Sequence, residues 1–254
     1  MQTIENQLAR CALWPERFPA EQWTLYKRVM NEAREHGIRF AIGGALASTT
    51  YSGQWRNTKD IDLYIKSSDR EKMVEVLSAA GLADYYDQKP YDRDWIYRSC
   101  RDDLIVDVMW AMANQRAQVD DVWLQGPEVE VEGEHFRLLP PEETLWSKLY
   151  VLQRDRCDWP DALSLLSAVG AEINWQHLLD RLGPDASLLS ALLTVFEWIY
   201  PEGAHQLPIG LRDQVAQARL DAPDASGASM DRARLLDSRQ WFPPATDDDG
   251  AAGK

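Results

Sequence analysis

The feature that most constrains the fold of this chain is a change in periodicity at Pro140-Pro141. Before these prolines, short segments with strand-like alternation are interspersed with segments whose apolar residues recur at helical spacing. After them the spacing is helical, over about residues 142–155, 159–169, 174–182, 186–200 and 208–219. This order predicts a small α/β or α+β domain followed by a helical domain.

The same change in periodicity sets the domain boundaries that we expect. Residues 1–139 form the first domain, residues 140–220 the helical domain, and residues 221–254 an acidic and largely flexible tail. The tail is rich in Asp, Ala, Ser, Gly and Pro, a composition that buries little apolar surface. Its apolar pairs at residues 235–236 and 241–242 are able to dock back on the body.

Charge and cysteine content restrict the classes of partner and compartment. The formal net charge is −14, and an acidic protein repels nucleic-acid phosphates, so extensive non-specific nucleic-acid binding is not expected. The three cysteines, Cys11, Cys100 and Cys157, lack the spacing of a zinc site or a disulfide framework. No secretory signal and no apolar run of about 20 residues is visible, so we expect a cytoplasmic protein without a membrane span.

Hydrophobic periodicity also predicts the helices and strands of the first domain. Helices are expected over about residues 19–36, 45–51 and 67–80. Strands are expected over about residues 39–42, 60–66, 95–99 and 104–110, with a further hairpin from 128–131 and 135–138. The first of these strands ends in Gly43-Gly44, directly before a helix.

The segment Asp60-Ile61-Asp62 carries the strongest chemical signal. Side chains two residues apart on a strand point the same way, with Cα atoms roughly 6.5–7 Å apart, so the two carboxylates repel each other. A divalent cation removes that repulsion, and magnesium prefers one or two carboxylates together with substrate phosphates. For an isolated Asp-x-Asp pair the better interpretation is a solvated edge strand that holds nothing.

Two neighbouring features favour the metal interpretation. Glycines at Gly43 and Gly44 allow backbone N–H groups to approach a phosphate at the start of a helix, although an ordinary tight turn also explains them. Asp107 lies inside the apolar run of residues 104–110 and requires a partner if that strand is central. Three converging carboxylates suit a two-metal phosphoryl-transfer site, whereas an edge aspartate satisfied by backbone N–H groups is the alternative.

The stretch that leads into the paired acids is polar. Thr58 shares a face with Asp60 and Asp62 and can hydrogen-bond a phosphate or orient a carboxylate. Arg56 can reach a triphosphate as a planar donor of several hydrogen bonds. A plain polar loop that enters a strand is an adequate alternative for Arg56.

Together, the runs 40–48 and 56–63 resemble the signature of the DNA polymerase β-type nucleotidyltransferases: a hydrophobic residue, Gly, Gly or Ser, a spacer, then Asp, a hydrophobic residue and Asp. The Arg-x-Thr-x-Asp-Ile-Asp form is similar to the branch that contains the AbiEii-like toxins and minimal nucleotidyltransferases. The resemblance implies an α+β fold, with a mixed β-sheet and flanking helices followed by a helical domain. It also implies that Asp60, Asp62 and Asp107 bind two magnesium ions, and that the triphosphate is bound by Gly43, Gly44, Ser48, Arg56, Thr58 and Lys148.

The helical domain adds weaker support. Residues 138–143 precede a helix that contains Lys148, and residues 154–158 follow it, an order that resembles the family's Pro-Glu helix start and its Lys…Arg…Asp region. In the family this lysine contacts the triphosphate. Taken alone, Lys148 on an amphipathic helix is a solvated surface lysine, and Asp158 reads more naturally as a salt-bridged structural residue.

These observations predict a nucleotidyltransferase that moves a nucleoside monophosphate from a nucleoside triphosphate, such as ATP, to an acceptor hydroxyl. The range of the family implies a protein, a tRNA end or a small molecule as the acceptor. Two alternatives stay open: a toxin–antitoxin component that acts with a small protein partner, and a catalytically silent nucleotide-binding module. Retention of all three acids, Asp60, Asp62 and Asp107, speaks against the silent module.

Overall fold

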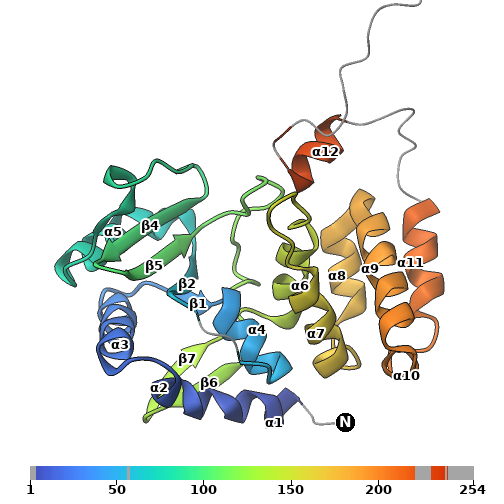
Figure 1. Ribbon diagram of the computed structural model, residues 1–254, viewed down its shortest axis with the longest axis horizontal. Helices are drawn as coiled ribbons and strands as arrows, with labels where there is room; N and C mark the ends of the chain where they lie inside the picture. The colour runs from blue at the N-terminus through green and yellow to red at the C-terminus, as the bar shows by residue number, and fades with distance from the viewer. Residues whose placement is uncertain (1–3, 56–57, 221–229, 238, 240–254) are drawn as a thin grey trace, which may run out of the picture.

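The computed structural model describes residues 4–55, 58–220, 230–237 and 239, and Figure 1 shows a sheet-containing half beside a helical half. The helices of the first half are α1 (Ile4–Leu8), α2 (Trp14–Arg17), α3 (Ala20–Glu35), α4 (Gly44–Ser52) and α5 (Arg70–Ala79). Its strands are β1 (Phe40–Ile42), β2 (Asp60–Ile65), β3 (Ala83–Asp84), β4 (Ile96–Arg101), β5 (Leu104–Met109), β6 (Glu128–Val131) and β7 (Glu134–Arg137). The predicted α+β fold is confirmed.

Within the described residues, the first half is built on a five-stranded mixed sheet with the order β1-β2-β5-β4-β3. Strands β2 and β5 are parallel, whereas the β1–β2, β5–β4 and β4–β3 pairs are antiparallel. A parallel pair requires a long crossover, and α5, β3 and β4 supply it. The two strands that carry the candidate acids therefore lie side by side, one strand in from the β1 edge.

Strand β2 shows the alternation that the sequence predicts. Ile61, Leu63 and Ile65 are buried in the hydrophobic core, whereas Asp60 and Asp62 are partly accessible. Helix α3 contributes to the same core the side chains that its periodicity places on one face, namely Trp23, Tyr26, Val29, Met30 and Ala33. The helix ends before Gly37, which adopts a φ of +71°.

The hairpin of β6 and β7 lies against α3 rather than in the main sheet. Its two-residue turn, Glu132-Gly133, has φ angles of 53° and 78°, as a tight hairpin turn requires. The carboxylate of Glu132 accepts a hydrogen bond from the Trp23 indole at 3.1 Å and forms an ion pair with Lys27 at 2.7 Å. These contacts fix the hairpin to the α3 surface.

The helical half contains α6 (Pro141–Leu149), α7 (Trp159–Val169), α8 (Trp175–Leu182), α9 (Ala186–Ile199), α10 (Pro201–Ala204) and α11 (Leu211–Leu220). Pro140 and Pro141 start α6, as the change in periodicity predicted. The predicted helix over 142–155 was too long, because α6 ends at Leu149. The following loop folds back on itself, and its backbone donates to its own carbonyls, from Gln153 to Arg156 at 2.8 Å and from Asp158 to Val151 at 2.9 Å.

One stretch, Trp175–Ile199, is long enough to cross a membrane and contains an 18-residue window with a mean hydropathy of 1.2, although the sequence had suggested no such run. In the structure it consists of α8 and α9, separated by the short 3-10 turn Gly183–Asp185. Leu189, Leu192 and Phe196 of this stretch are buried inside the protein. Core helices of this kind pass the same length and composition test.

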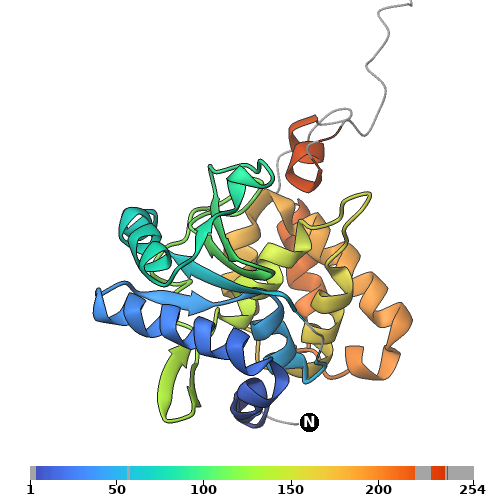
Figure 2. The ribbon, with the colours of Figure 1, turned by 60° about the vertical axis from the view of Figure 1, so that its left-hand side comes forward.

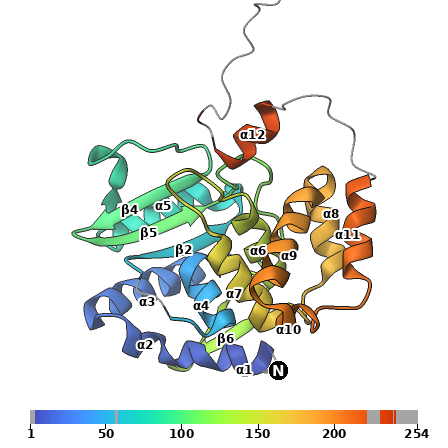
Figure 3. The ribbon, with the colours of Figure 1, turned by 45° about the vertical axis from the view of Figure 1, so that its right-hand side comes forward.

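The two halves pack directly against each other. Helix α4 of the first half lies beside α7 of the second, and Figure 3 shows this contact below the sheet. Asp185 strengthens the junction: its buried carboxylate accepts hydrogen bonds from Arg116 Nε at 2.9 Å and from the Tyr150 hydroxyl at 2.6 Å. The hollow that holds the candidate acids is therefore walled by elements of both halves.

Part of the predicted tail is a short helix, α12 (Met230–Leu236), at the top of the molecule in Figure 2. Its Leu235 carbonyl accepts a hydrogen bond from the Asn114 side chain at 2.9 Å. Arg239, just beyond the helix, forms an ion pair with Asp155 at 2.7 Å. Thus α12 and Arg239 together contact one loop from each half, and the apolar pair at residues 235–236 packs against the body.

Candidate active site

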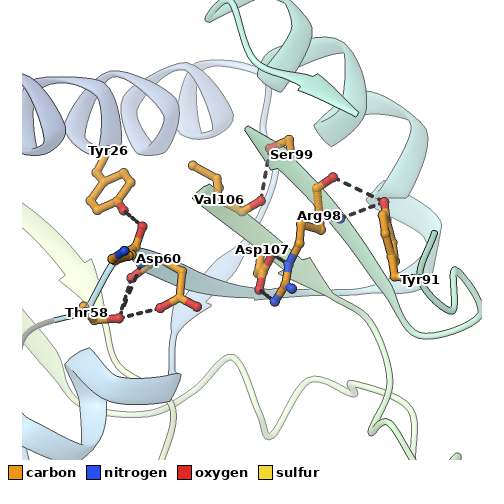
Figure 4. A network of polar contacts seen from close by, with 9 residues as sticks. Tyr26, Thr58, Asp60, Tyr91, Arg98, Ser99, Val106 and Asp107 are labelled. Atoms are coloured by element: carbon orange, nitrogen blue, oxygen red, sulfur yellow. Dashed lines mark hydrogen bonds and ion pairs between the residues drawn. The ribbon is translucent and has the colours of Figure 1, made fainter. Parts of the chain in front are cut away.

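Three charged side chains form one row across the centre of the sheet. In the parallel β2–β5 pair, Asp62 lies opposite Asp107, and in the antiparallel β5–β4 pair, Asp107 lies opposite Arg98. Cross-strand neighbours point to the same side of a sheet, so the order of charge along this row is carboxylate, carboxylate, guanidinium. Asp60 precedes Asp62 by two residues on the same face, and Figure 4 shows it near Asp107 and Arg98.

The glycine turn after β1 lies directly against this row. Gly43 donates its backbone N–H to the carbonyl of Asp62 at 2.9 Å. A Cβ atom on Gly44 would lie 1.5 Å from Oδ2 of Asp62, and Gly44 also has a φ of +53°. A Cβ atom on Gly43 would lie 2.3 Å from the Tyr64 ring. Both positions therefore require glycine, because any side chain would displace a carboxylate or an aromatic ring of β2.

Gly44 also begins α4, and the residue that precedes it, Gly43, has no side chain to cap this end of the helix. The first N–H groups of a helix have no partner within it, and they carry a positive partial charge. In this fold that charge lies beside Asp62, at the wall of a cavity of about 510 Å³ that Gly44 and Ala45 line. A volume of this size suits a nucleotide-sized ligand.

The acids in the cavity are electrostatically strained in the absence of a cation. Burial, followed by the charges of Asp60 and Asp107, raises the pKa of Asp62 to about 7. Burial also raises the pKa of Asp107, although the Arg98 guanidinium opposes this shift. A divalent cation between Asp60 and Asp62 would remove most of the repulsion, so the donor set fits magnesium at this position.

Thr58 orients the first of the two paired acids. Its hydroxyl donates to a carboxylate oxygen of Asp60 and lies 3.1 Å from the backbone carbonyl of the same residue (Figure 4). Tyr26 holds the preceding peptide through a 3.0 Å hydrogen bond to the carbonyl of Lys59. Thr58 therefore lies where the sequence suggested a residue that orients a carboxylate, whereas Arg56 lies outside the described residues.

Ser48 occupies a different place from the one its proposed ligand role requires. It is buried on α4, one turn beyond the helix start, and its hydroxyl donates to the Gly44 carbonyl at 2.8 Å. It does not line the cavity among the residues that the structure describes. The hydroxyl is occupied by the helix itself, as is common for serine inside a helix.

Asp107 is engaged by an arginine that the sequence did not single out. Arg98 donates from Nε to Oδ1 of Asp107 at 2.8 Å and from Nη2 to Oδ2 at 2.5 Å, so both carboxylate oxygens are occupied. This fork is the strongest common geometry for a carboxylate–guanidinium pair. Within the described part of the chain, no three acids, histidines or cysteines lie close enough to hold a metal ion as they stand.

Lys148 is buried, although its residue type alone indicated a solvent-exposed side chain. Its ammonium group forms an ion pair with Asp161 at 2.8 Å and lies 3.5 Å from Asp158, at the wall of the same cavity. Asp158 also accepts from Arg156 at 3.0 Å, so it has the salt-bridged environment that the sequence favoured for it. The Lys148 charge thus faces the cavity from the helical half, opposite the acids of β2.

Two parts of the cavity wall were not predicted from the sequence, namely Arg98 and residues 234–237. Arg98 could have been found from hairpin register, because the two-residue turn Asp102-Asp103 pairs Arg101 with Leu104 and so places Arg98 opposite residue 107. The second part is residues 234–237 of α12 and its end, which also line the cavity. Its apolar pair was the only local signal of docking, and no local pattern identifies the loop that α12 contacts.

Comparison with known proteins places the chain in a family. The model of a family described as uncharacterised nucleotidyltransferase matches residues 6–198. No curated protein sequence matches the chain. The matched span contains the glycine turn at 43–44, the paired acids at 60–62 and Lys148, but not α12.

Several solved structures are similar to the chain at low identity. The antibiotic-resistance factor ANT(2'')-Ia is 21% identical over 74% of this chain and 97% of its own, with a TM-score of 0.45. The lincosamide antibiotic adenylyltransferase LnuA is 14% identical over 57% of this chain and 96% of its own, with a TM-score of 0.43. An antigenic nucleotidyltransferase-like protein from Paracoccidioides brasiliensis is 17% identical over 80% of this chain and 94% of its own, with a TM-score of 0.47.

Likenesses of this size carry no inference about substrates. The family match is of a different kind, because it spans most of the chain and includes both motifs on which the DNA polymerase β-type resemblance rests. The chain therefore belongs to this family of nucleotidyltransferases.

Proposed function

We propose that the protein is a magnesium-dependent enzyme that transfers a nucleoside monophosphate from a nucleoside triphosphate, with ATP the first candidate, to an acceptor hydroxyl. One observation carries this proposal. Asp60 and Asp62 lie in a cavity beside a glycine turn and an uncapped helix start, and the pKa of Asp62 is raised to about 7. Such a site combines carboxylates that favour a divalent cation with backbone N–H groups that favour phosphate.

The residues of the site divide into those that bind the metal ion and those that bind the phosphates. Asp60 and Asp62 are the ligands for a first magnesium ion, and Thr58 fixes the Asp60 carboxylate for this task. When bound, magnesium supplies positive charge that neutralises the triphosphate and polarises its α-phosphate. Gly43 and Gly44 leave room for the side chains of Tyr64 and Asp62, and so allow Asp62 to lie against the start of α4, where backbone N–H groups favour phosphate.

Lys148 supports the triphosphate from the helical half. Its ammonium group is buried at the cavity wall and is held there by Asp161 and Asp158. A buried lysine anchored by two carboxylates loses little side-chain freedom when it contacts a phosphate. We assign Asp107 to a second magnesium ion or to the proton of the acceptor hydroxyl, as the family resemblance implies.

The transfer step needs little covalent chemistry from the protein. The acceptor oxygen forms a bond to the α-phosphorus, the bond from that phosphorus to the β-phosphate oxygen breaks, and pyrophosphate leaves. The acceptor proton passes to Asp107 or to solvent. Positioning and charge neutralisation account for the rate, as they do in phosphoryl transfer generally.

The acceptor is a protein hydroxyl, a tRNA end or a small molecule. The net charge of −14 repels RNA phosphates, so it favours a protein or a small molecule over tRNA. We place the enzyme in the cytoplasm, where the free cysteines Cys11, Cys100 and Cys157 stay reduced. Membership of the AbiEii-like branch, and with it action as a toxin with a small protein partner, stays a prediction. A small protein that co-purifies, or that relieves growth arrest, would support that role.

The test uses each labelled nucleoside triphosphate in turn, with magnesium and cell extract. We expect one triphosphate to label one class of molecule and to release pyrophosphate. Asp60→Asn and Asp62→Asn should abolish labelling with the fold intact, whereas Asp103→Asn, in an exposed turn of the same sheet, should not change it. Undiminished pyrophosphate release by the double variant at residues 60 and 62 would contradict the proposal, and no labelling by the wild type would favour the silent module.

A further inference from the structure

Arg98 and Asp107 differ sharply in their freedom to move. The Asp107 side chain is 3% exposed and is fixed within a central strand, whereas the Arg98 side chain is 35% exposed and lines the cavity. The backbone of Arg98 is held, because its N–H donates to the Tyr91 hydroxyl at 2.9 Å (Figure 4). Only the guanidinium can leave its partner without a change in the sheet.

The charges in the row account for one metal ion and not for two. Arg98 neutralises Asp107 through both oxygens, which leaves the charges of Asp60 and Asp62. These two carboxylates together match a single divalent cation. The Arg98 guanidinium occupies the position at Asp107 that a second cation would need, and its positive charge would repel that cation.

An incoming triphosphate changes this balance. It brings several negative charges into the cavity that Arg98 lines, and a guanidinium binds phosphate through the same planar fork that it offers to a carboxylate. We propose that Arg98 holds Asp107 in the nucleotide-free enzyme and transfers to the triphosphate when the nucleotide binds, which frees Asp107 for a second metal ion. Arg98 is thus a positioning residue that couples nucleotide binding to completion of the metal site.

This inference rests on the proposed function and goes one step beyond it. It explains why the described residues contain no ready three-carboxylate metal site although Asp62 and Asp107 are cross-strand neighbours. A second metal ion that enters only with the nucleotide would also prevent idle metal binding by the free enzyme. The alternative is that the Arg98–Asp107 pair is permanent and only stabilises the sheet.

The two roles are separated by metal binding without nucleotide. We would titrate metal-free protein with Mn²⁺ and follow the free ion by electron paramagnetic resonance, for the wild type and for Arg98→Gln. The wild type should bind one ion, whereas Arg98→Gln should bind two, or bind the ion roughly tenfold or more tightly, because a charged hydrogen-bonded pair no longer competes. Equal stoichiometry and affinity in the two proteins would refute the proposal.

A matched control and a double variant exclude trivial causes. Arg101→Gln removes an arginine of the same strand that is 34% exposed, pairs with Glu21 at 3.8 Å and is not among the described residues that line the cavity, so it should leave Mn²⁺ binding unchanged. Arg98→Gln combined with Asp107→Asn should lose the additional binding, since the freed carboxylate is gone. If the double variant keeps it, the ion is not at Asp107 and the inference fails. Circular dichroism verifies that each variant is folded.

Nucleotide binding supplies a second readout. Arg98→Gln should bind Mn²⁺ more tightly yet bind a non-hydrolysable ATP analogue about tenfold more weakly, since the guanidinium no longer reaches the triphosphate. A purely structural pair would weaken both. If wild-type protein binds Mn²⁺ and the analogue but Arg98→Gln behaves identically, only the inference about Arg98 fails. If the wild type binds neither, the proposed function itself fails.

Discussion

Replacing Asp62 with asparagine should stabilise the metal-free protein while removing its response to metal. The change keeps the shape of the side chain and deletes a charge that lies close to Asp60 and Asp107. Residues retained for function commonly reduce stability in this way, because a site prepared for a cation is strained without it. The expected sign is therefore opposite to that of an ordinary substitution in a buried strand.

The magnitude follows from the pKa of Asp62, which rises from 3.8 to about 7 through burial first and then through the charges of Asp60 and Asp107. Each pH unit corresponds to about 1.36 kcal/mol, so the shift sets a ceiling of about 4 kcal/mol on the cost of ionising Asp62 in the folded state. Solvent access to the cavity and the polar amide of the variant reduce the gain, so we expect roughly 1–3 kcal/mol. For a chain of this length that raises Tm by roughly 2–10 °C.

The pH dependence identifies the cause. Because the folded state holds the Asp62 proton more tightly than the unfolded chain does, ionisation disfavours the folded state as pH rises from 3.8 to about 7. The difference in the free energy of unfolding between Asp62→Asn and wild type should therefore grow across that window and stay constant above it. Urea unfolding of metal-free protein at a series of pH values measures this difference.

Addition of magnesium with a non-hydrolysable ATP analogue should raise the Tm of the wild type but not that of Asp62→Asn. Asp103→Asn, which removes a charge from an exposed turn, should show neither the pH-dependent gain nor the loss of ligand response. The reasoning is refuted if Asp62→Asn is less stable than wild type at pH 8 without metal, or if the difference between them is independent of pH between 4 and 7.

Three further substitutions test other parts of the site. Gly44→Ala should cost about 2 kcal/mol or more and weaken nucleotide binding, since its Cβ would lie 1.5 Å from Oδ2 of Asp62; unchanged calorimetric binding of the ATP analogue would contradict this. Lys148→Met should raise KM for the triphosphate roughly tenfold while the protein stays folded, and steady-state kinetics and thermal melts would show the two effects. Asp185→Ala should destabilise the protein by about 3 kcal/mol, because it leaves Arg116 without its buried partner, and chemical unfolding measures that loss.

Much of the architecture is local in origin and was accessible from sequence. The alternation along residues 60–66 placed Asp60 and Asp62 on the accessible face of a strand. The helix expected to end near residue 36 and the hairpin expected from 128–131 and 135–138 both lie at glycines, Gly37 and Gly133, that adopt positive φ angles. The helix predicted over 142–155 ends early, at Leu149, because the backbone N–H and C=O groups of the next loop hydrogen-bond to each other. Hydrophobic periodicity carries no information about such hydrogen bonds.

The chain by itself determined which residue types carry charge and which face of each strand they occupy, because both follow from side-chain chemistry and a repeat of two. Strand order and register were decided only by the tertiary structure: the parallel pairing of β2 with β5 sets Asp107 beside Asp62, and the β4–β5 hairpin sets Arg98 beside Asp107. Burial was decided there too, since it converts Lys148 from a surface residue into part of the cavity wall. Contacts between distant segments depend on the packing of the whole chain, and no local pattern encodes them.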